Sequence, residues 1–479
     1  MSLAKSVFKN VSYLLIARSA FRFLTAVALI YAARYLGTER YGMFETATAW
    51  ANMFLALNDV GMSTLIVREA ARDPKKTAVY FGNTLLVETI LSLVIFFVLL
   101  GIGIGFRYDH TTMLLIGILG ASNLIFEFRK VMRGIFRVHM NMGFIAFVEI
   151  LNGALFCITT FLIIFLITNP DTGLLGIAQA SLFIDTLCIV LLLWYTVRLV
   201  KPKIQTQLIW PMMKQAYTFT LYNIFFMLYF QIDQIILSIM VGKSEVGIYS
   251  AAAKLVTMFL FIPMMLFQVT MPILYRYSKT DINKFKHINL ITFRYLAALG
   301  IPAGIVLWFL SDTIIPLVFG EKYLAAIPVL SIFGWFLAIR FLGMNQGNAL
   351  TTMDKQGLRA TIQIISLVIN VILDIVLIRY WGAVGAAIAT LITEMLISVS
   401  SIILCAHFLK ESLLQTIRSL APILGATLAL WVILFLAKPY VSAIILLILA
   451  VVSYLFFLWI FRFFTTEDKQ LIRHIVQKN

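Results

Sequence analysis

Two arginines in the first long apolar stretch of the chain are the residues best suited to bind an anion. Arg18 and Arg22 lie four residues apart within residues 11–33, so a helix would place both side chains on one face. An arginine at the centre of a membrane-spanning helix costs about 2.5–3.5 kcal/mol on an insertion scale, which disfavours placing two of them against lipid. We expect both guanidinium groups to face a polar, anion-binding cavity. Snorkelling to the membrane surface or pairing with a carboxylate is the alternative.

Other ionisable residues lie within apolar stretches, where a charge is costly unless it is paired or functional. The further cations are Lys254, Arg294 and Arg340. The acids are Glu45, Asp59, Glu88, Asp185, Asp233, Asp374 and Glu394. For any one acid, a structural salt bridge is as reasonable as a functional role. The cations of both halves could together bind a diphosphate, because guanidinium groups hold phosphate oxygens with charge-assisted hydrogen bonds. We count Glu45 and Asp59 with them as candidate substrate-binding residues.

A second group of residues suits a small cation. Asn370 and Asp374 are four residues apart and therefore share a helix face, while Asp233 and Thr390 lie on two other predicted helices. Carboxylate, amide and hydroxyl oxygens are the ligands that a hard cation such as sodium prefers. A set of interhelical hydrogen bonds is the alternative.

The sequence contains no recognisable cofactor or catalytic motif. The 3 cysteines and 5 histidines form no pair with metal-ligand spacing, and no phosphate-binding loop or nucleophile elbow occurs. We therefore expect no cofactor and no enzymatic activity. Any energy for transport would come from a sodium or proton gradient or from the membrane potential.

The composition excludes a soluble globular protein. The chain is 61% hydrophobic and 13% charged, whereas soluble domains are about 45–50% apolar and about 25% charged. Its net charge of +16 would suggest nucleic acid in a soluble protein, but here it reflects topology, and we expect no nucleic-acid partner. The sequence predicts an all-α polytopic membrane protein with fourteen spanning helices. Their approximate ranges are 11–33, 43–66, 78–103, 112–128, 144–167, 174–197, 216–240, 247–271, 288–309, 326–349, 360–378, 382–406, 419–437 and 441–461.

The distribution of Lys and Arg predicts the orientation of these helices. Most of the 38 basic residues lie at the two ends and in the even-numbered connections. Both termini are therefore expected in the cytoplasm of a multi-pass cell-membrane protein. The longest connection, around residues 198–215, divides the chain near its middle.

Two sequence echoes indicate an internal duplication. Residues 36–44 resemble residues 241–249, and residues 173–180 resemble residues 382–389 at nearly the same separation. The shared glycines permit tight turns and close helix approach; chance similarity among Gly/Ala-rich segments is the alternative. Duplication predicts an N-lobe (1–200) and a C-lobe (201–408) of six helices each, and then two further helices with a cytoplasmic interfacial tail (409–479). Repeats of this kind often meet at a central substrate site.

The chain resembles the multidrug/oligosaccharidyl-lipid/polysaccharide exporter superfamily, and within it the polysaccharide-transporter branch, the flippases of lipid-linked oligosaccharides. The resemblance is carried by residues 10–12 with Arg18, residues 35–37 with 41–42, residues 58–61, and the Gly382, Gly385 and Ala387 pattern. It covers essentially the whole chain. It implies two six-helix lobes in a V shape around a cationic cavity with alternating access.

The resemblance also implies roles for individual residues. Lipid II flippases of the superfamily have a sodium site with the residue types of Asp233, Asn370, Asp374 and Thr390 on the corresponding helices. They also place cavity arginines on helices 1, 2 and 8. Arg18 and Arg22 match the arginines of helix 1, and Lys254 stands in for the arginine of helix 8. Asn52 lies where the arginine of helix 2 would be expected. This departure makes lipid II itself a less suitable cargo.

These observations predict a flippase that moves a polyprenyl-diphosphate-linked oligosaccharide from the cytoplasmic to the outer leaflet, for polysaccharide or cell-envelope glycan synthesis. We expect a monomer among membrane lipids, with glycan polymerases or glycosyltransferases as candidate partners. One alternative is a cation-coupled multidrug exporter of the same superfamily, which would need an acidic or aromatic pocket. The other is a membrane glycan polymerase or ligase, which would need a larger outer loop than residues 310–325.

Overall fold

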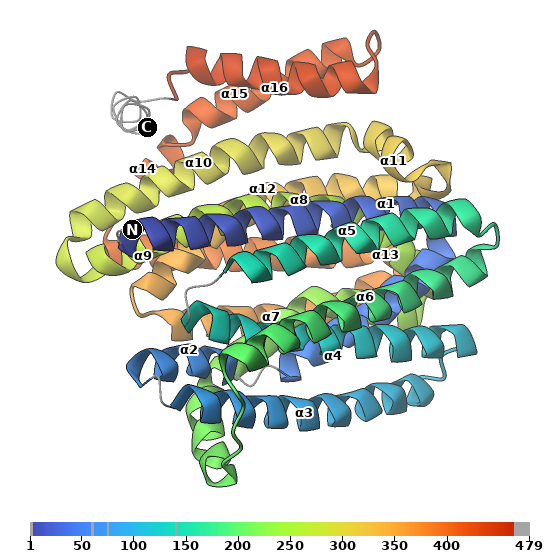
Figure 1. Cartoon of the computed structure of the whole chain (residues 1–479). Coiled ribbons are helices and arrows are strands. Elements are labelled where there is room, and N and C mark those ends of the chain that lie inside the picture. Colours follow the sequence, from blue (N-terminus) through green and yellow to red (C-terminus); the bar gives the residue numbers. More distant parts are fainter. Residues whose placement is uncertain (1–2, 59–61, 74–75, 139–141, 464–479) are drawn as a thin grey trace. The chain divides into compact units, whose positions relative to one another are not determined.

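The computed structural model is built from helices joined by short connections (Figure 1). It describes residues 3–58, 62–73, 76–138 and 142–463, and no strand occurs in these ranges. The helices are α1 (Leu3–Asn58), α2 (Met62–Arg72), α3 (Thr77–Gly105), α4 (His110–Val138), α5 (Gly143–Leu166), α6 (Pro170–Leu199), η2 (Thr206–Leu208), α7 (Ile209–Met240), α8 (Lys243–Phe259), α9 (Phe261–Thr280), α10 (Ile282–Phe309), α11 (Ser311–Phe319), η3 (Glu321–Ala326), α12 (Ile327–Thr352), α13 (Gln356–Leu409), α14 (Leu413–Arg418), α15 (Ala421–Ala437) and α16 (Ala443–Ile460).

The predicted number of membrane spans is confirmed in the described part of the chain. There, 11 helices are long and apolar enough to cross a membrane. Two of them, α1 and α13, are each divided by a glycine with non-helical backbone angles, and the apolar end of α7 adds a further span. Together these make the 14 spans that hydropathy predicted.

Several helices extend beyond their predicted ranges, α4 and α7 among them. The fourth span was expected to end at residue 128, but α4 continues to Val138. The seventh was expected to begin at residue 216, but α7 begins at Ile209, so the connection around 198–215 is mostly helical. Met212 explains the second difference, because it packs into a buried cluster with Met62, Leu65 and Val87 and thereby favours one more helical turn.

Glycines make the turns that the sequence echoes predicted. Gly37 inside α1 has φ 75°, Gly242 before α8 has φ 128°, and Gly382 inside α13 has φ 53°. L-residues rarely adopt this left-handed region, so glycine is needed at each turn. Gly37 and Gly242 occupy the same place in the two echoes, which supports the duplication.

A second pair of echoed glycines brings two helices into backbone contact. A Cβ atom at Gly42 would lie 1.7 Å from the carbonyl oxygen of Lys243, and one at Gly247 would lie 2.0 Å from that of Thr38. The Thr38 and Ser244 hydroxyls are 3.0 Å apart across the same crossing. The start of α8 therefore crosses α1 at a point where no side chain fits.

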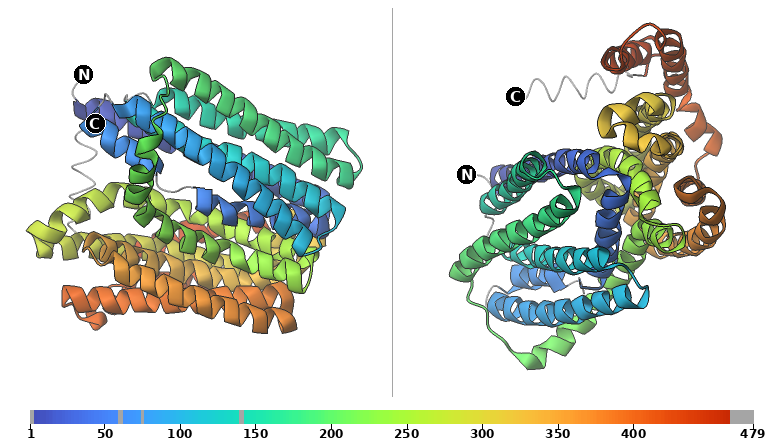
Figure 2. Two further views of the ribbon diagram at one scale, coloured as in Figure 1. Left: turned by 90° about the horizontal axis from the view of Figure 1, so that it is seen from below. Right: turned by 90° about the vertical axis from the view of Figure 1, so that its right-hand side faces the viewer.

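The turn between α5 and α6, a pair of neighbouring helices in Figure 2, is held by polar contacts. The Asn169 side chain caps α6 by accepting a hydrogen bond from the Asp171 N–H at 2.9 Å. Arg40 forms a two-pronged ion pair with Asp171 at 2.5 and 2.9 Å. The hydrogen bond from Arg40 lowers the pKa of the Asp171 carboxyl below its ordinary value.

The chain forms two compact units. One contains Met1–Ala251 and Val371–Ala386, and the other contains Ala252–Asn370 and Ala387–Asn479. The lobe boundaries at residues 200 and 408 stay a prediction. The predicted interfacial helix at the C-terminus falls on residues 464–479, outside the described residues.

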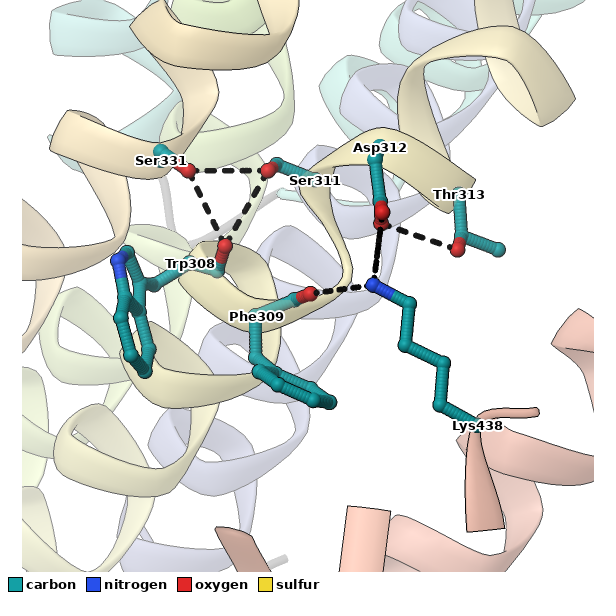
Figure 3. Close-up of polar contacts among 7 residues, drawn as sticks. All are labelled: Trp308, Phe309, Ser311, Asp312, Thr313, Ser331 and Lys438. Atoms are coloured by element: carbon teal, nitrogen blue, oxygen red, sulfur yellow. Dashed lines mark hydrogen bonds and ion pairs between the residues drawn. The ribbon is translucent and has the colours of Figure 1, made fainter. Parts of the chain in front are cut away.

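In the second unit, the last two spanning helices attach to α10 and α11 through Lys438 (Figure 3). Its ammonium group donates to both oxygens of Asp312, at 2.7 and 2.9 Å, and to the Phe309 carbonyl at 3.3 Å. Within α16, the Tyr454 hydroxyl donates to the Ala298 carbonyl at 2.7 Å. The outer connection expected at residues 310–325 thus contains α11 and η3 and serves as an attachment point.

The glycine crossing predicts a position-specific loss of stability. Gly247→Ala should lower the midpoint of thermal unfolding in detergent, because its Cβ would collide with the Thr38 carbonyl. Gly101→Ala is the matched control, since a Cβ at this helical glycine meets nothing within 4 Å; it should leave stability unchanged or raise it by up to about 1 kcal/mol. Equal midpoints for the two variants would contradict the crossing.

Candidate functional site

The structure brings further arginines to the predicted pair in the first unit. Arg18 and Arg22 lie on α1, Arg18 half-buried and Arg22 exposed. Arg22 interacts electrostatically with Arg18 and with Glu149 of α5. Arg133 of α4 interacts with Arg18, Arg129 and Glu149. Arg18, Arg22, Arg129 and Arg133 are called the arginine cluster below.

The extension of α4 explains why two of these arginines were not predicted. Residues beyond 128 were expected in a connection, so Arg129 and Arg133 were read as loop charges. In the structure they lie on α4, four residues apart, with the same spacing as Arg18 and Arg22. That spacing is the sequence signal that could have indicated them.

Asp185 of α6 is a fully bonded buried carboxylate. It forms an ion pair with the Arg129 guanidinium and accepts hydrogen bonds from Ser122 at 2.6 Å and from Asn152 at 2.9 Å. These contacts join α4, α5 and α6. Because its oxygens are occupied by protein donors, we interpret Asp185 as a structural residue that keeps Arg129 in the helical bundle.

Glu149 is as buried as Asp185 but is bonded differently. Its Oε1 atom lies 3.8 Å from Arg133 Nε, too far for a hydrogen bond. Among the described residues its Oε2 atom has no hydrogen-bond partner, nor do Nε and Nη1 of Arg129. The arginine cluster therefore keeps unused donors, and unused guanidinium donors are what binds phosphate oxygens.

The other predicted substrate residues are distributed over both units. Glu45 is buried on α1, and Asp59 lies outside the described residues. In the second unit Lys254 is half-buried on α8. Arg294 of α10 donates to the Phe463 carbonyl at 2.6 Å and holds the end of α16. Of the predicted cations, Arg18 and Arg22 thus lie together in the arginine cluster, whereas Arg294 is hydrogen-bonded to the Phe463 carbonyl.

Arg340 of α12 forms a buried ion pair with Glu394 of α13 at 2.5 Å, and Ser398 donates to the other Glu394 oxygen at 3.1 Å. This pair is the counterpart of Arg129–Asp185. Each joins the fourth and sixth spans of its repeat, at nearly the sequence separation of the glycine echoes. The duplication therefore includes buried contacts as well as turns.

The predicted cation ligands include an acidic pair within the first unit. The Asp233 carboxyl on α7 accepts a hydrogen bond from Tyr249 at 2.5 Å, and its charge interacts with that of the Asp374 carboxyl. Neither Asp374 oxygen has a hydrogen-bond partner among the described residues. Two buried carboxyl groups whose charges interact are stabilised by a proton or a cation between them.

Asn370 lies one helical turn from Asp374, and both are fully buried. Neither polar atom of the Asn370 side chain has a hydrogen-bond partner among the described residues. Such unused oxygens fit a small cation. Thr390 is buried on α13, and its part in a cation site stays a prediction. No cluster of three His, Cys, Asp or Glu suited to a metal occurs in the described ranges.

The fold and its buried charges define a polytopic α-helical membrane protein of the transporter type. Residues 7–278 match the family described as "Polysaccharide biosynthesis protein", and residues 219–376 match the MatE family. The chain belongs to the polysaccharide biosynthesis protein family. This confirms its place in the multidrug/oligosaccharidyl-lipid/polysaccharide exporter superfamily.

Three proteins are similar in sequence. The chain is 26% identical to "Probable flippase AglR" of Haloferax volcanii over 397 residues, which cover 79% of each protein. It is 29% identical over 186 residues to "Probable low-salt glycan biosynthesis flippase Agl15" of the same organism, covering 38% of each. It is 31% identical over 128 residues to "Teichuronic acid biosynthesis protein TuaB" of Bacillus subtilis, covering 26% of each. The chain thus spans less than half the length of Agl15 and TuaB.

Two solved structures share the fold. The lipid II flippase MurJ in an inward closed conformation superposes with a TM-score of 0.76 at 16% identity, over 93% of this chain and 98% of MurJ. An inward-facing multidrug resistance MATE family transporter superposes with a TM-score of 0.68 at 17% identity, over 81% of this chain and 94% of that one. At these identities the likeness concerns the fold alone.

The buried ion pair predicts a large effect of removing one partner. Asp185→Asn should destabilise the protein by about 3–5 kcal/mol, because it leaves Arg129 buried without a counter-ion. Asp171→Asn, which removes an acid from an exposed ion pair, should change stability little. Denaturant unfolding of both variants in the same detergent measures the difference.

If Asp185→Asn proves as stable as wild type, the carboxylate is not the structural partner of Arg129. The double variant Arg129→Met with Asp185→Leu provides a second test, because removing both charges should restore part of the lost stability.

Proposed function

We propose that the protein is a flippase that translocates a polyprenyl-diphosphate-linked oligosaccharide across the membrane. The observation that carries the proposal is the arginine cluster, whose buried donors are only partly used by protein acceptors. A diphosphate supplies several charged oxygens to such donors. The names of AglR and Agl15, which describe flippases and glycan biosynthesis, support the same cargo class.

The proposed direction is from the cytoplasmic to the outer leaflet of the cell membrane. The bias of Lys and Arg toward the termini and the even-numbered connections supports cytoplasmic ends. Alternating access would expose the cluster first to the cytoplasmic and then to the outer leaflet. The fold shared with MurJ and with a MATE transporter supports this mechanism. Lys254 and Arg340, which belong to the second unit, stay predicted substrate residues.

We further propose that a cation drives the cycle through the acidic pair. A sodium ion beside Asp233 and Asp374 would stabilise their two interacting charges. Asn370 and Thr390, which belong to the second unit, stay predicted ligands of this cation. Binding shifts the conformational equilibrium only if the ion prefers one state over the other. A proton shared by the two carboxyls is the alternative coupling ion.

Drug export is the second candidate function, because residues 219–376 match the MatE family. A cationic drug would require an acidic or aromatic pocket, and the excess positive charge of the arginine cluster disfavours it. Neither function requires a catalytic group. Glycosyltransferases that supply the lipid-linked glycan, or polymerases that consume it, are the expected partners, and a monomer is sufficient for the proposed mechanism.

Loss of one cluster arginine should strongly slow translocation. In proteoliposomes with a fluorescent polyprenyl-diphosphate sugar, Arg18→Ala and Arg133→Ala should each reduce the flipping rate by roughly tenfold to a hundredfold, the cost of lost charge-assisted hydrogen bonds. Arg198→Ala is the control, because that exposed arginine stacks on Trp194 instead. Wild-type flux in both cluster variants would refute the cavity role, and efflux of a cationic dye without flipping would indicate a drug exporter.

Sodium dependence tests the acidic pair separately. Flipping should rise with an imposed sodium gradient in the wild type and lose this response in Asp374→Asn. Asp312→Asn, in an exposed ion pair with Lys438, should keep it. If a proton gradient drives flipping while sodium has no effect, protons are the coupling ion. If neither gradient acts, the acidic pair has no coupling role.

A further inference from the structure

Glu149 occupies an unusual position within the arginine cluster. Its charge interacts with those of Arg22, Arg129 and Arg133. Its side chain is buried, yet none of these arginines is within hydrogen-bonding distance, and the nearest ion-pair atoms are 3.8 Å apart. Its Oε2 atom has no hydrogen-bond partner in the described part of the chain.

Asp185 is a directly bonded counter-ion in the same group of helices, and it can be compared with Glu149. It contacts Arg129 directly, and two neutral donors complete its shell. Among the described residues, Arg129 also retains unused donors at Nε and Nη1, and Glu149 accepts a hydrogen bond from neither. The two carboxylates therefore differ in bonding and not in burial. One is fixed by protein donors, and the other compensates charge from a distance.

Charge compensation by Glu149 is needed when the cluster holds no ligand. The charges of Arg18, Arg22, Arg129 and Arg133 repel one another, and Asp185 neutralises only Arg129 by direct contact. A buried excess of positive charge destabilises a helical bundle unless an anion is near. A bound diphosphate would supply that anion and would make Glu149 redundant.

We propose that Glu149 is a displaceable counter-ion that competes with the diphosphate of the substrate for the arginine cluster. This inference rests on the proposed function. With no substrate, Glu149 compensates Arg22 and Arg133. When the diphosphate binds, its oxygens accept hydrogen bonds from the unused guanidinium donors, and the Glu149 side chain moves away from the arginines. When the substrate leaves, Glu149 takes back its position, so release does not leave the positive charge of the cluster without its compensating carboxylate.

The competition sets the affinity of the site. A transporter must release its substrate on the far side, so binding that is too tight slows each cycle. Glu149 raises the free energy of the bound state by electrostatic repulsion of the diphosphate, and it lowers that of the empty state by compensating the arginines. Both effects weaken binding and speed release. Glu149 is therefore a residue that tunes affinity and turnover in opposite directions.

The test measures affinity and turnover in the same full-length variants. Binding of a short-chain polyprenyl diphosphate to protein in lipid nanodiscs gives the dissociation constant, and inorganic pyrophosphate serves as competitor. Glu149→Gln, which removes the charge and keeps the shape, should bind about tenfold more tightly, a change of about 1.4 kcal/mol. It should also flip more slowly at saturating substrate. Glu88→Gln, which removes a buried carboxylate on α3, should change neither value.

The outcomes separate this inference from the proposed function. Tighter binding with slower flipping in Glu149→Gln supports the displaceable counter-ion. If the wild-type protein binds the diphosphate and Glu149→Gln binds it equally or more weakly, the displaceable counter-ion is overturned and the flippase proposal stays intact. No diphosphate binding by wild type or variants overturns both. If Glu149→Gln does not fold, Glu149→Asp keeps the charge but withdraws it from Arg133. That variant should bind with intermediate affinity, and wild-type affinity would overturn the inference.

Discussion

The pairing of charges buried among apolar helices is the constraint on which the structure depends. Arg129 and Asp185 tie α4 to α6 and, through Asn152, to α5. Arg340 and Glu394 tie α12 to α13. An unpaired charge at either place would cost several kcal/mol, so the partners determine which helices can be neighbours and how far they extend. α4 continues past its predicted end and thereby carries Arg129, whose partner is Asp185.

The duplication organises both the turns and these contacts. Gly37 and Gly242 supply left-handed residues at equivalent turns, while Gly42 and Gly247 let the two copies cross at backbone distance. Arg129–Asp185 and Arg340–Glu394 are then equivalent ion pairs in the two halves. A single ancestral six-helix unit accounts for all of them, because each feature occurs once per repeat at nearly the same sequence separation. The repeats differ at Glu149, whose counterpart region at the start of α13 contains no acid.

Hydropathy and glycine positions were sufficient to predict the fourteen spans and the turn glycines, because both depend on local composition. Contacts between distant residues were not predictable in this way. From the sequence alone, Arg129 and Arg133 were assigned to a connection. Their acidic neighbours, Glu149 on α5 and Asp185 on α6, are distant in sequence and become visible only in the structure. Arg294 was grouped with the cavity cations, and no pattern indicated its hydrogen bond to the carbonyl of Phe463. The pair of Asp233 with Asp374 was expected only through residue types, and Tyr249 was not expected at all.

Hydrogen bonding, more than burial or charge, distinguishes Asp185 and Glu394 from the polar residues proposed to bind ligands. Asp185 and Glu394 are buried and saturated by protein donors, so they have nothing left to offer a ligand. Glu149, Asn370 and the spare donors of Arg129 are equally buried but unsaturated within the described residues. A site that binds and releases a ligand in every cycle cannot be saturated by its own protein, since each bond to the ligand would have to replace an existing one. The unsaturated groups include arginine donors with a distant carboxylate, and carboxylates one helical turn from an unbonded amide. These groups suit a diphosphate and a cation, the two ligands of the proposed flippase.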